Sequence, residues 1–494
     1  MIEAIRLVNF MAFRDTGWVD LKPITLIFGK NSSGKSALIR ALLLLKQSVD
    51  TTDTARPLNF FSTTGIDLEG FRTIVHAQDD KTPLGFGFRF RFRELEEKAR
   101  NGILVYVNNE RANNNEDVFS PTDPNLFIEA GFSYKLNTSS EDELIPTSLQ
   151  LNLVYFSETR RETVILLDID KTKEESVTFS DILSALVINN IQLGSPKYGF
   201  WPQCVLEGDD QKSGLMLLED IQLFYEAIQR QIMDFLVKIS YIGPLREPPQ
   251  RVYAISRSSR ITAKEKGASG FYRFLERELD TSQSDQIDLW AQNLELAQKV
   301  AVVPEERQQW VGYSSLSQII ISEFGGLSVN LSDVGSGTAQ VLPVVIESIS
   351  AKEDALVIIE QPELHLHPDA QSTIADLFIE LINQPQEGGS ITGKRFLLET
   401  HSEHILIRLR KRLAQTAKNV LPENEAQKQL SINQLVVYLV TRNQGTLVSD
   451  ISPVILNKVG EYRQLPKGFR DFFASDTVDV LEMTSAKLGI KQDE

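Results

Sequence analysis

The sequence has few of the residues and runs that define several common protein classes. Cys204 is the only cysteine among 494 residues, which excludes an intrachain disulfide framework and a CxxC metal site. No run of ~18 uninterrupted apolar residues predicts a membrane-spanning helix. The opening stretch "MIEAIRLVNF" lacks a basic segment and a small-residue cleavage site, so no signal peptide is predicted. We therefore expect a cytoplasmic protein without a membrane partner.

Basic residues are outnumbered by acidic ones, 51 to 67, so the formal net charge is −16. This net charge argues against a surface that is basic throughout, but nucleic acid needs only a local basic stripe. One such stretch is residues 246–266, "REPPQRVYAISRSSRITAKEK". Its arginines fit phosphate contacts, and a solvated loop with salt-bridging arginines is the alternative. The candidate DNA contacts are Arg246, Arg251, Arg257 and Arg260.

The first part of the chain reads as strand, strand, loop and helix. "EAIRLVNFMAF" and "ITLIFG" have strand composition, and "SALIRALLLLKQS" has helical length and spacing. Short β-like runs such as "LGFGFRFRF" continue to about residue 200. The segment 108–125 is a predicted polar loop. This part therefore predicts many short strands after one long helix.

The later part of the chain has a different pattern. Helices are expected at 214–238 and 284–300, and strands at 355–360, 395–399 and 434–441. The three strands alternate with helical segments. That alternation indicates an α/β fold with a mostly parallel sheet covered by helices.

The most specific motif is "GKNSSGKS" at 29–36, which matches G-x-x-x-x-G-K-[ST] between a strand and a helix. Its glycines let backbone N–H groups close around phosphate oxygens at a helix N-terminus. Lys35 would reach the β- and γ-phosphates, and Ser36 would ligate Mg²⁺. The expected ATP contacts are Gly29, Lys30, Asn31, Ser32, Ser33, Gly34, Lys35 and Ser36.

Two further motifs lie in the later part of the chain. In "LSDVGSGTAQVLPVV", Ser336 and Gly337 stand just before an apolar helix and predict a second anion site. In "VIIEQPELHLHP", Glu360 ends an apolar strand, where it would bind Mg²⁺ directly or through water. Both sites would serve the same nucleotide chemistry as the loop at 29–36.

The last motif is "RFLLETHSEHILIRL" at 395–409, in which a strand ends at Glu399 and His401 follows. A histidine at the carboxyl end of such a strand can reach a γ-phosphate as a donor or orient water. Four of the five histidines fall in HxH or HxxH spacings, which also suggests zinc. The ATP site accounts for these histidines without a transition metal, and no cysteine ligands accompany them.

With these motifs in order, the chain resembles the ABC-type P-loop ATPases of the RecF, SMC and OLD group. More narrowly, it resembles bacterial predicted ATPases with a short C-terminal domain of unknown function, of the kind found in anti-phage defence systems. The resemblance implies an ABC-type ATPase domain with a mostly parallel sheet, split by a long β-rich and helical insertion. It makes Ser336 and Gly337 the signature that contacts the partner's nucleotide. It also makes Glu360 the Walker B acid and His401 the switch histidine.

This reading predicts five segments along the chain. The two halves of the ATPase domain are 1–75 and 315–420, the insertion is 76–240, a basic linker with a helical segment is 241–314, and a small C-terminal region is 421–494.

The sequence departs from the family at the catalytic position, where the usual Asp-Glu pair is Glu360-Gln361. A glutamine cannot accept a proton, but its amide can orient water. Glu363 is the other candidate for the missing carboxylate. Gln361, Glu363 and His401 are therefore the catalytic candidates, and we expect slow hydrolysis of ATP with a long-lived ATP-bound state.

The predicted function is an ATP- and Mg²⁺-dependent switch that forms a head-to-tail homodimer or higher homo-oligomer. It would gate a separate effector, a nuclease or toxin, and the resemblance implies a role in anti-phage defence. The alternative is a RecF-like repair ATPase that binds DNA through 246–266 and "RLRKRL" at 408–413. A stand-alone nuclease is disfavoured, because Asp476 and Asp479 do not form Asp-x-Asp. The signature and switch histidine disfavour a metabolite kinase.

Overall fold

The computed structural model describes residues 2–49, 51, 53, 56–61, 66–137, 143–157, 161–171, 176–179, 188–194, 199–208, 212–255, 269–276, 279–304, 315–385 and 393–469. The chain divides into two compact units, Met1–Leu21 with Ser36–Ile239 and Lys22–Lys35 with Ser240–Glu494. Each unit has a large sheet of its own. None of the helices in this part of the chain has the length and apolar character needed to span a bilayer.

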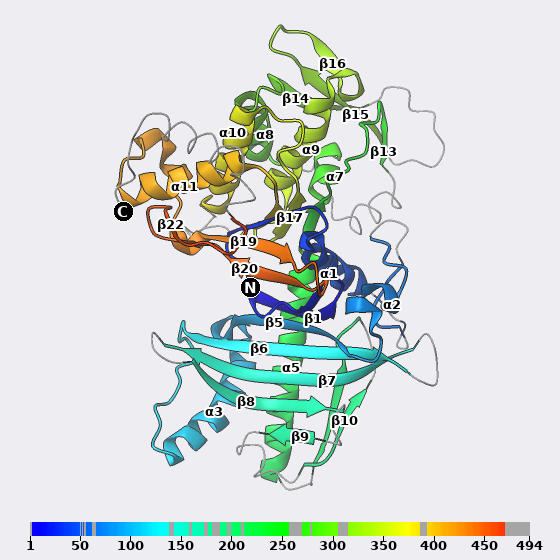
Figure 1. Cartoon of the computed structure of the whole chain (residues 1–494), viewed down its shortest axis with the longest axis vertical. Helices are drawn as coiled ribbons and strands as arrows, with labels where there is room; N and C mark the ends of the chain where they lie inside the picture. Colours follow the sequence, from blue (N-terminus) through cyan, green and yellow to red (C-terminus); the bar gives the residue numbers. More distant parts are fainter. Residues whose placement is uncertain are drawn as a thin grey trace. The chain divides into compact units, whose positions relative to one another are not determined.

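The first unit is built on an antiparallel sheet in the order β2-β1-β5-β6-β7-β8-β9, with β3 paired to β1. Figure 1 shows β6, β7 and β8 side by side. The strands of the sheet are β1 (Ile2–Phe10), β2 (Phe13–Asp15), β3 (Val19–Asp20), β5 (Leu84–Arg91), β6 (Leu126–Leu136), β7 (Leu144–Phe156), β8 (Arg161–Asp170) and β9 (Ser176–Phe179). A separate hairpin consists of β10 (Ile188–Gly194) and β11 (Gln203–Gly208).

Two long helices of the first unit, α3 and α5, pack against each other. Ile221, Tyr225, Ile228 and Ile232 are buried on α5, and their spacing of three or four residues forms one apolar stripe. The helices and 3-10 turns of this unit are α1 (Lys35–Ser48), α2 (Phe71–Ile74), η1 (His76–Gln78), η2 (Phe92–Glu94), α3 (Glu97–Asn113) and α5 (Lys212–Val237). The helix predicted at 214–238 is thereby confirmed.

The second unit contains a six-stranded sheet in the order β12-β17-β18-β4-β19-β20. All pairs are parallel except β19 with β20, so the predicted mostly parallel sheet is confirmed. Its strands are β4 (Ile24–Gly29), β12 (Ser240–Ile242), β17 (Leu356–Glu360), β18 (Arg395–Glu399), β19 (Leu435–Arg442) and β20 (Ser449–Pro453). Every residue of β4, β17 and β18 is buried, as expected for parallel strands covered on both faces.

Smaller elements complete the second unit, where Figure 1 shows α8, α9, α10 and α11 gathered beside its sheet. The helices and 3-10 turns are α7 (Ser269–Leu275), α8 (Thr281–Asn293), η3 (Leu331–Asp333), α9 (Ser336–Ser350), α10 (Pro368–Ile382), α11 (Glu403–Ala417), η4 (Glu423–Lys428) and η5 (Ile432–Gln434). The remaining strands are β13 (Tyr253–Ile255), β14 (Lys299–Pro304), β15 (Ser315–Ser322), β16 (Ser328–Asn330), β21 (Ile455–Leu456) and β22 (Tyr462–Gln464).

Two predicted elements differ from the structure. The segment 108–125 is not a loop throughout, because α3 extends to Asn113. The helix predicted at 284–300 ends at Asn293, and β14 then begins at Lys299. Glu295 has a φ of 56°, which breaks the helical path, and the Asp288 carboxylate accepts the Val300 N–H from the returning chain. Composition alone did not reveal this reversal.

The two compact units also differ from the five predicted segments. β1 pairs with β5, so the N-terminal strand shares a sheet with strands of the predicted insertion 76–240. The first unit contains both β1 and that insertion, whereas the strand before the P-loop belongs to the second. A segment list in chain order cannot express strand pairing between residues that are far apart in the sequence.

A buried ion network joins α10 and α11 in the second unit. The Arg412 guanidinium donates from Nε and Nη2 to the two Asp376 carboxylate oxygens at 2.9 and 2.6 Å. It also donates to Glu425 at 2.6 Å, and this contact lowers the pKa of Glu425 to about 2. Arg412 is 2% exposed and Asp376 3%. The pair is therefore a buried polar contact between the two helices, and Arg408 Nε lies 3.8 Å from the same Asp376 carboxylate.

We predict that Arg412→Ala destabilises the protein by about 3–5 kcal/mol, because it removes both guanidinium hydrogen bonds from the buried Asp376 carboxylate and leaves only the more distant Arg408 as a cation. The neighbouring exposed Lys411→Ala should change the free energy of unfolding by less than ~0.5 kcal/mol. Urea denaturation of both variants measures the difference. Equal midpoints would show that the network contributes nothing.

Candidate functional site

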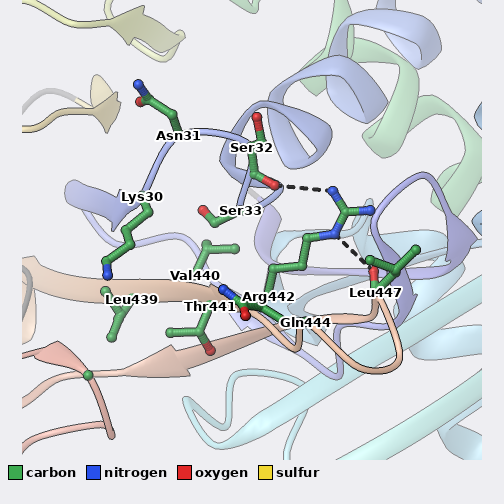
Figure 2. A pocket seen from close by; sticks show the side chains of 11 residues that line it. Lys30, Asn31, Ser32, Ser33, Leu439, Val440, Thr441, Arg442, Gln444 and Leu447 are labelled. Atoms are coloured by element: carbon green, nitrogen blue, oxygen red, sulfur yellow. Dashed lines mark hydrogen bonds between the residues drawn. The ribbon is translucent and has the colours of Figure 1, made fainter.

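The predicted P-loop lies where β4 ends and α1 begins. Lys30, Asn31, Ser32 and Ser33 line one wall of a pocket of about 530 Å³, and the end of β19 with the turn of its hairpin lines the other. Figure 2 shows Arg442 of that hairpin reaching between the two walls. It donates to the Ser32 carbonyl at 3.4 Å and to the Leu447 carbonyl at 3.1 Å. Arg442 thereby ties the hairpin to the loop.

Lys35 is buried at the end of this loop, with 5% of its surface exposed. Its Nζ donates to the carbonyls of Gly29 at 2.8 Å and Lys30 at 3.1 Å. The Glu399 carboxylate lies 3.7 Å from the same ammonium. Burial lowers the pKa of Lys35, and the negative charge of Glu399 opposes that shift. The loop therefore curls around a charged ammonium group.

The loop fits a bound phosphate chain. A Cβ on Gly29 would stand 2.5 Å from the Val440 carbonyl and 2.6 Å from Ser33 Oγ, and φ is 156° there, so this position requires glycine. Ser33 Oγ is buried without a hydrogen-bond partner in the part of the chain that the structure describes, which leaves it able to donate to a phosphate oxygen. Gly34 has a φ of 107°, which also requires glycine. These features suit the phosphates of ATP.

The predicted Mg²⁺ ligands have suitable chemistry, because hydroxyl and carboxylate oxygens are the donors that Mg²⁺ prefers. Glu360 is 8% exposed, and its Oε1 accepts the Tyr241 hydroxyl at 2.7 Å. Ser36 follows Lys35 and belongs to the first compact unit, so its proposed role rests on its place in the motif. Among the described residues, no group of three histidine, cysteine or acidic side chains could hold a metal by itself.

Two glutamates end adjacent strands of the sheet. Glu360 of β17 and Glu399 of β18 are register partners, and β18 is also the direct neighbour of β4. Paired residues of parallel strands point to the same face of a sheet. Glu360 and Glu399 therefore lie on one face at its carboxyl edge, with Glu399 one strand closer to the P-loop.

Gln361 and Glu363 follow β17. Gln361 has no carboxylate, and the Glu363 carboxylate is already hydrogen-bonded. Gln361 has a φ of 50° and donates its N–H to the Glu399 carbonyl at 2.7 Å. The Glu363 carboxylate accepts the Thr400 hydroxyl at 2.8 Å and the His401 N–H at 2.7 Å. Burial raises the pKa of Glu363, and these hydrogen bonds act against the shift. Glu363 thus holds the segment that carries His401.

His401 lies half-buried near the same charges. Burial, and then the positive charge of Lys35, lower the pKa of its imidazole. A neutral imidazole can donate through one nitrogen and accept through the other. The structure therefore brings His401 together with Lys35, Glu363 and Glu399.

The predicted signature begins a helix in the same unit. α9 starts at Ser336, which is exposed, and its N-cap residue Gly335 supplies no side-chain cap. Arg246 connects this helix to the end of β17. Its guanidinium donates to the carbonyls of Gln340 at 3.0 Å, Glu360 at 3.2 Å and Gln361 at 3.0 Å.

The arginines proposed for DNA have other partners where the structure describes them. The Arg246 guanidinium is half-buried and donates to three carbonyls, and burial lowers its pKa to about 10, so its proposed DNA contact stays a prediction. Arg251 is exposed and pairs with Asp333. Arg257 and Arg260 lie outside the described residues.

The basic run at 408–413 also turns inward. Arg408 donates to the Ser372 carbonyl, Arg410 donates to the Gly460 carbonyl, and Arg412 belongs to the buried network. Lys411 is the exposed cation of this run. The run therefore does not form a continuous basic stripe.

Several residues of the site carry no assigned role in the sequence. Glu399 precedes His401 at a strand end, which is the same signal that identifies Glu360, so its position could have been recognised. Tyr241, Thr400 and Arg442 have no local signature. Their roles depend on partners that are distant in the sequence.

Comparison with known proteins identifies the family. The model of the AAA ATPase domain family (AAA_15) matches residues 1–406. No curated protein matches the chain. Among solved structures, the SMC head domain from Thermotoga maritima is 12% identical, with 92% of this chain and 99% of that chain covered and a TM-score of 0.32. An Smc head domain bound to the C-terminal domain of ScpA, derived from Pyrococcus furiosus, is 10% identical, with 92% and 96% covered and a TM-score of 0.33.

The family match spans most of the chain and includes the loop at 29–36, β17 and β18. The α/β fold with its mostly parallel sheet agrees with an ABC-type P-loop ATPase domain. The protein therefore belongs to the AAA ATPase domain family, and it is a nucleotide-binding ATPase.

Proposed function

We propose that this ATPase is a nucleotide-dependent switch. Two chains pair head to tail around ATP, and the paired state gates a separate effector protein. Hydrolysis is slow, so that ATP occupancy rather than turnover sets the state of the switch. The observation that carries this proposal is the exposed start of α9, which has no side-chain cap.

The first N–H groups of a helix have no partners within the helix, and the helix dipole favours an anion beside them. In α9 these groups follow the exposed Ser336. The strand after α9 is β17, which β18 separates from β4. β17 and β4 are therefore two strand spacings apart, which is about 10 Å. Head-to-tail pairing would place the phosphates bound to one chain's loop at the α9 terminus of the other.

Arg246 supports coupling between such a shared site and the chain's own hydrolytic edge. One guanidinium binds a carbonyl of α9 and two carbonyls at the end of β17. A displacement of α9 by the partner's nucleotide would therefore act directly on Glu360 and Gln361. Dimerisation and ATP occupancy would then be linked equilibria, each favouring the other.

Slow hydrolysis is supported by the groups that follow β17. Gln361 cannot accept a proton, and both oxygens of Glu363 are already hydrogen-bonded. Glu363 would have to release Thr400 and His401 before it could serve as a base. We infer that Glu363 positions the His401 segment and that the proton of the attacking water goes elsewhere.

This inference predicts different results for two substitutions of Glu363. Glu363→Gln should keep single-turnover hydrolysis within about threefold of wild type, since an amide can replace both hydrogen bonds once Thr400 turns to accept. Glu363→Ala should reduce the rate by ~100-fold, because it releases the His401 segment from its position. Rapid-quench measurement on preloaded protein tests both variants. A loss of ~10²–10⁴ for Glu363→Gln would instead identify Glu363 as the base.

Head-to-tail pairing predicts complementation between two inactive variants. Lys35→Ala removes the loop's cation, and Ser336→Glu puts a negative charge where the partner's phosphate would lie. In a mixture only the heterodimer can form, and one of its two loop–signature pairs is intact, so about half of wild-type hydrolysis should return. Light scattering with ATP should show dimers in the mixture but not for either variant alone.

A matched control for Ser336→Glu is Thr281→Glu, which adds the same charge at the first residue of another helix, α8. An acid at a helix N-terminus is favourable, so neither substitution should unfold its helix. Wild-type dimerisation and hydrolysis by Ser336→Glu alone would exclude a shared site.

The proposal that the paired state gates a separate effector protein rests on the family resemblance, which also implies anti-phage defence. We predict that tagged protein expressed with its native gene neighbours co-purifies with a partner in an amount that changes with Lys35→Ala. The exposed Lys352→Ala removes the same charge elsewhere and should behave as wild type. Equal recovery of the same partner with wild type and Lys35→Ala would contradict nucleotide gating.

A further inference from the structure

Glu399 is the acidic residue closest to the cation of the P-loop. It ends β18, the strand that lies directly beside β4. It is 5% exposed, and its Oε1 lies 3.7 Å from Lys35 Nζ. Since Lys35 is the group expected at the β- and γ-phosphates, the Glu399 carboxylate lies at the end of the site where the bond would be cleaved.

The other acids of the site have different partners. Glu360 accepts the Tyr241 hydroxyl and is the predicted Mg²⁺ ligand. Glu363 accepts two hydrogen bonds from the segment that begins at Thr400. Gln361 has no carboxylate, and its backbone N–H binds the carbonyl of Glu399 itself. Gln361 and Glu399 are thus in direct contact through their backbones.

We propose that Glu399 supplies the carboxylate of the hydrolytic centre, in place of the acid that Gln361 lacks. The carboxylate accepts a hydrogen bond from the attacking water and takes its proton. The water oxygen bonds to the γ-phosphorus as the bond from that phosphorus to the β,γ-bridging oxygen breaks. The electron pair of the broken bond leaves with ADP. This assignment rests on the proposed ATP site at 29–36.

The Glu399 carboxylate also forms an ion pair with Lys35. The two opposite charges lie beside each other, and both side chains are buried. Phosphates would draw the ammonium towards themselves and leave Glu399 facing the terminal phosphate and its water. The base is therefore exposed to its substrate only when Lys35 has moved to the nucleotide.

The competing reading is that Glu399 only neutralises Lys35. In that case Glu399→Gln changes ATP affinity and the stability of the nucleotide-free protein, while bound ATP is hydrolysed at the wild-type rate. Adding Gln361→Glu to Glu399→Gln would then not raise the hydrolysis rate, because that rate was never lost. The two readings therefore predict different hydrolysis rates and ATP affinities for Glu399→Gln, and different effects of adding Gln361→Glu.

The test uses the full-length protein and four variants: Glu399→Gln, Glu399→Asp, Glu399→Gln combined with Gln361→Glu, and the control Glu403→Gln. Glu403 is an exposed acid in the first turn of α11. The readouts are the single-turnover hydrolysis rate, the ATP dissociation constant from calorimetry in EDTA, and the melting temperature without nucleotide.

We expect Glu399→Gln to bind ATP within about threefold of wild type and to lose ~10²–10⁴ in hydrolysis rate. Gln361→Glu should restore at least ~10-fold in that background, because it returns a carboxylate to the adjacent strand end. Glu403→Gln should match wild type. An unchanged rate for Glu399→Gln, or a lost rate that Gln361→Glu fails to raise, would overturn the proposal.

Glu399→Asp decides the matter if Glu399→Gln does not fold. It keeps the charge beside Lys35 but withdraws the carboxylate by one methylene, so the rate should fall while affinity and melting temperature stay near wild type. An unchanged rate would exclude Glu399 as the base. Failure of the switch itself is recognised separately, as absence of ATP-dependent dimers in the wild-type protein.

Discussion

The buried ammonium of Lys35 is the interaction on which the candidate site depends. A charge removed from water is costly unless other groups compensate it, and Lys35 has two carbonyl oxygens and the Glu399 carboxylate around it. These partners compensate for the loss of water around the charge. The terminal phosphates of a nucleotide offer the same ammonium an opposite charge. If Lys35 binds these phosphates as proposed, nucleotide binding would exchange one set of partners for another, and the exchange would separate Lys35 from Glu399.

The parallel sheet gives the exchange its geometry. β17, β18 and β4 run in the same direction, so their carboxyl ends meet at one edge, where ligands bind in open α/β sheets. The order of the strands decides which acid comes nearest to Lys35. Glu360 and Glu399 are in register, but β18 stands between β17 and β4. A residue at the end of β18 thus reaches the loop more closely than its neighbour at the end of β17.

The sequence predicted the loop at 29–36, the three strands of the later half and the P-loop ATPase domain, because each depends on a local pattern. "ITLIFG" became β4 and "RFLLE" became β18. It did not predict the tasks of Glu363 and Arg246, whose partners come from other motifs. Thr400 lies 37 residues from Glu363, and Glu360 lies 114 from Arg246. One sequence contains no pairing information across such separations, so an arginine that holds three carbonyls looks the same as one on the surface.

The position of the acid also bears on why Gln361 is tolerated. A glutamate at position 361 would sit next to Glu360, with β18 between it and the cation that could offset its charge. Glu399 has that cation beside it, so the charge of the buried carboxylate is paired. If Glu399 is the base, hydrolysis requires Lys35 to leave the base for the phosphate, which makes catalysis conditional on a correctly seated nucleotide. Such a requirement lowers the rate of hydrolysis and lengthens the ATP-bound state, as a switch needs.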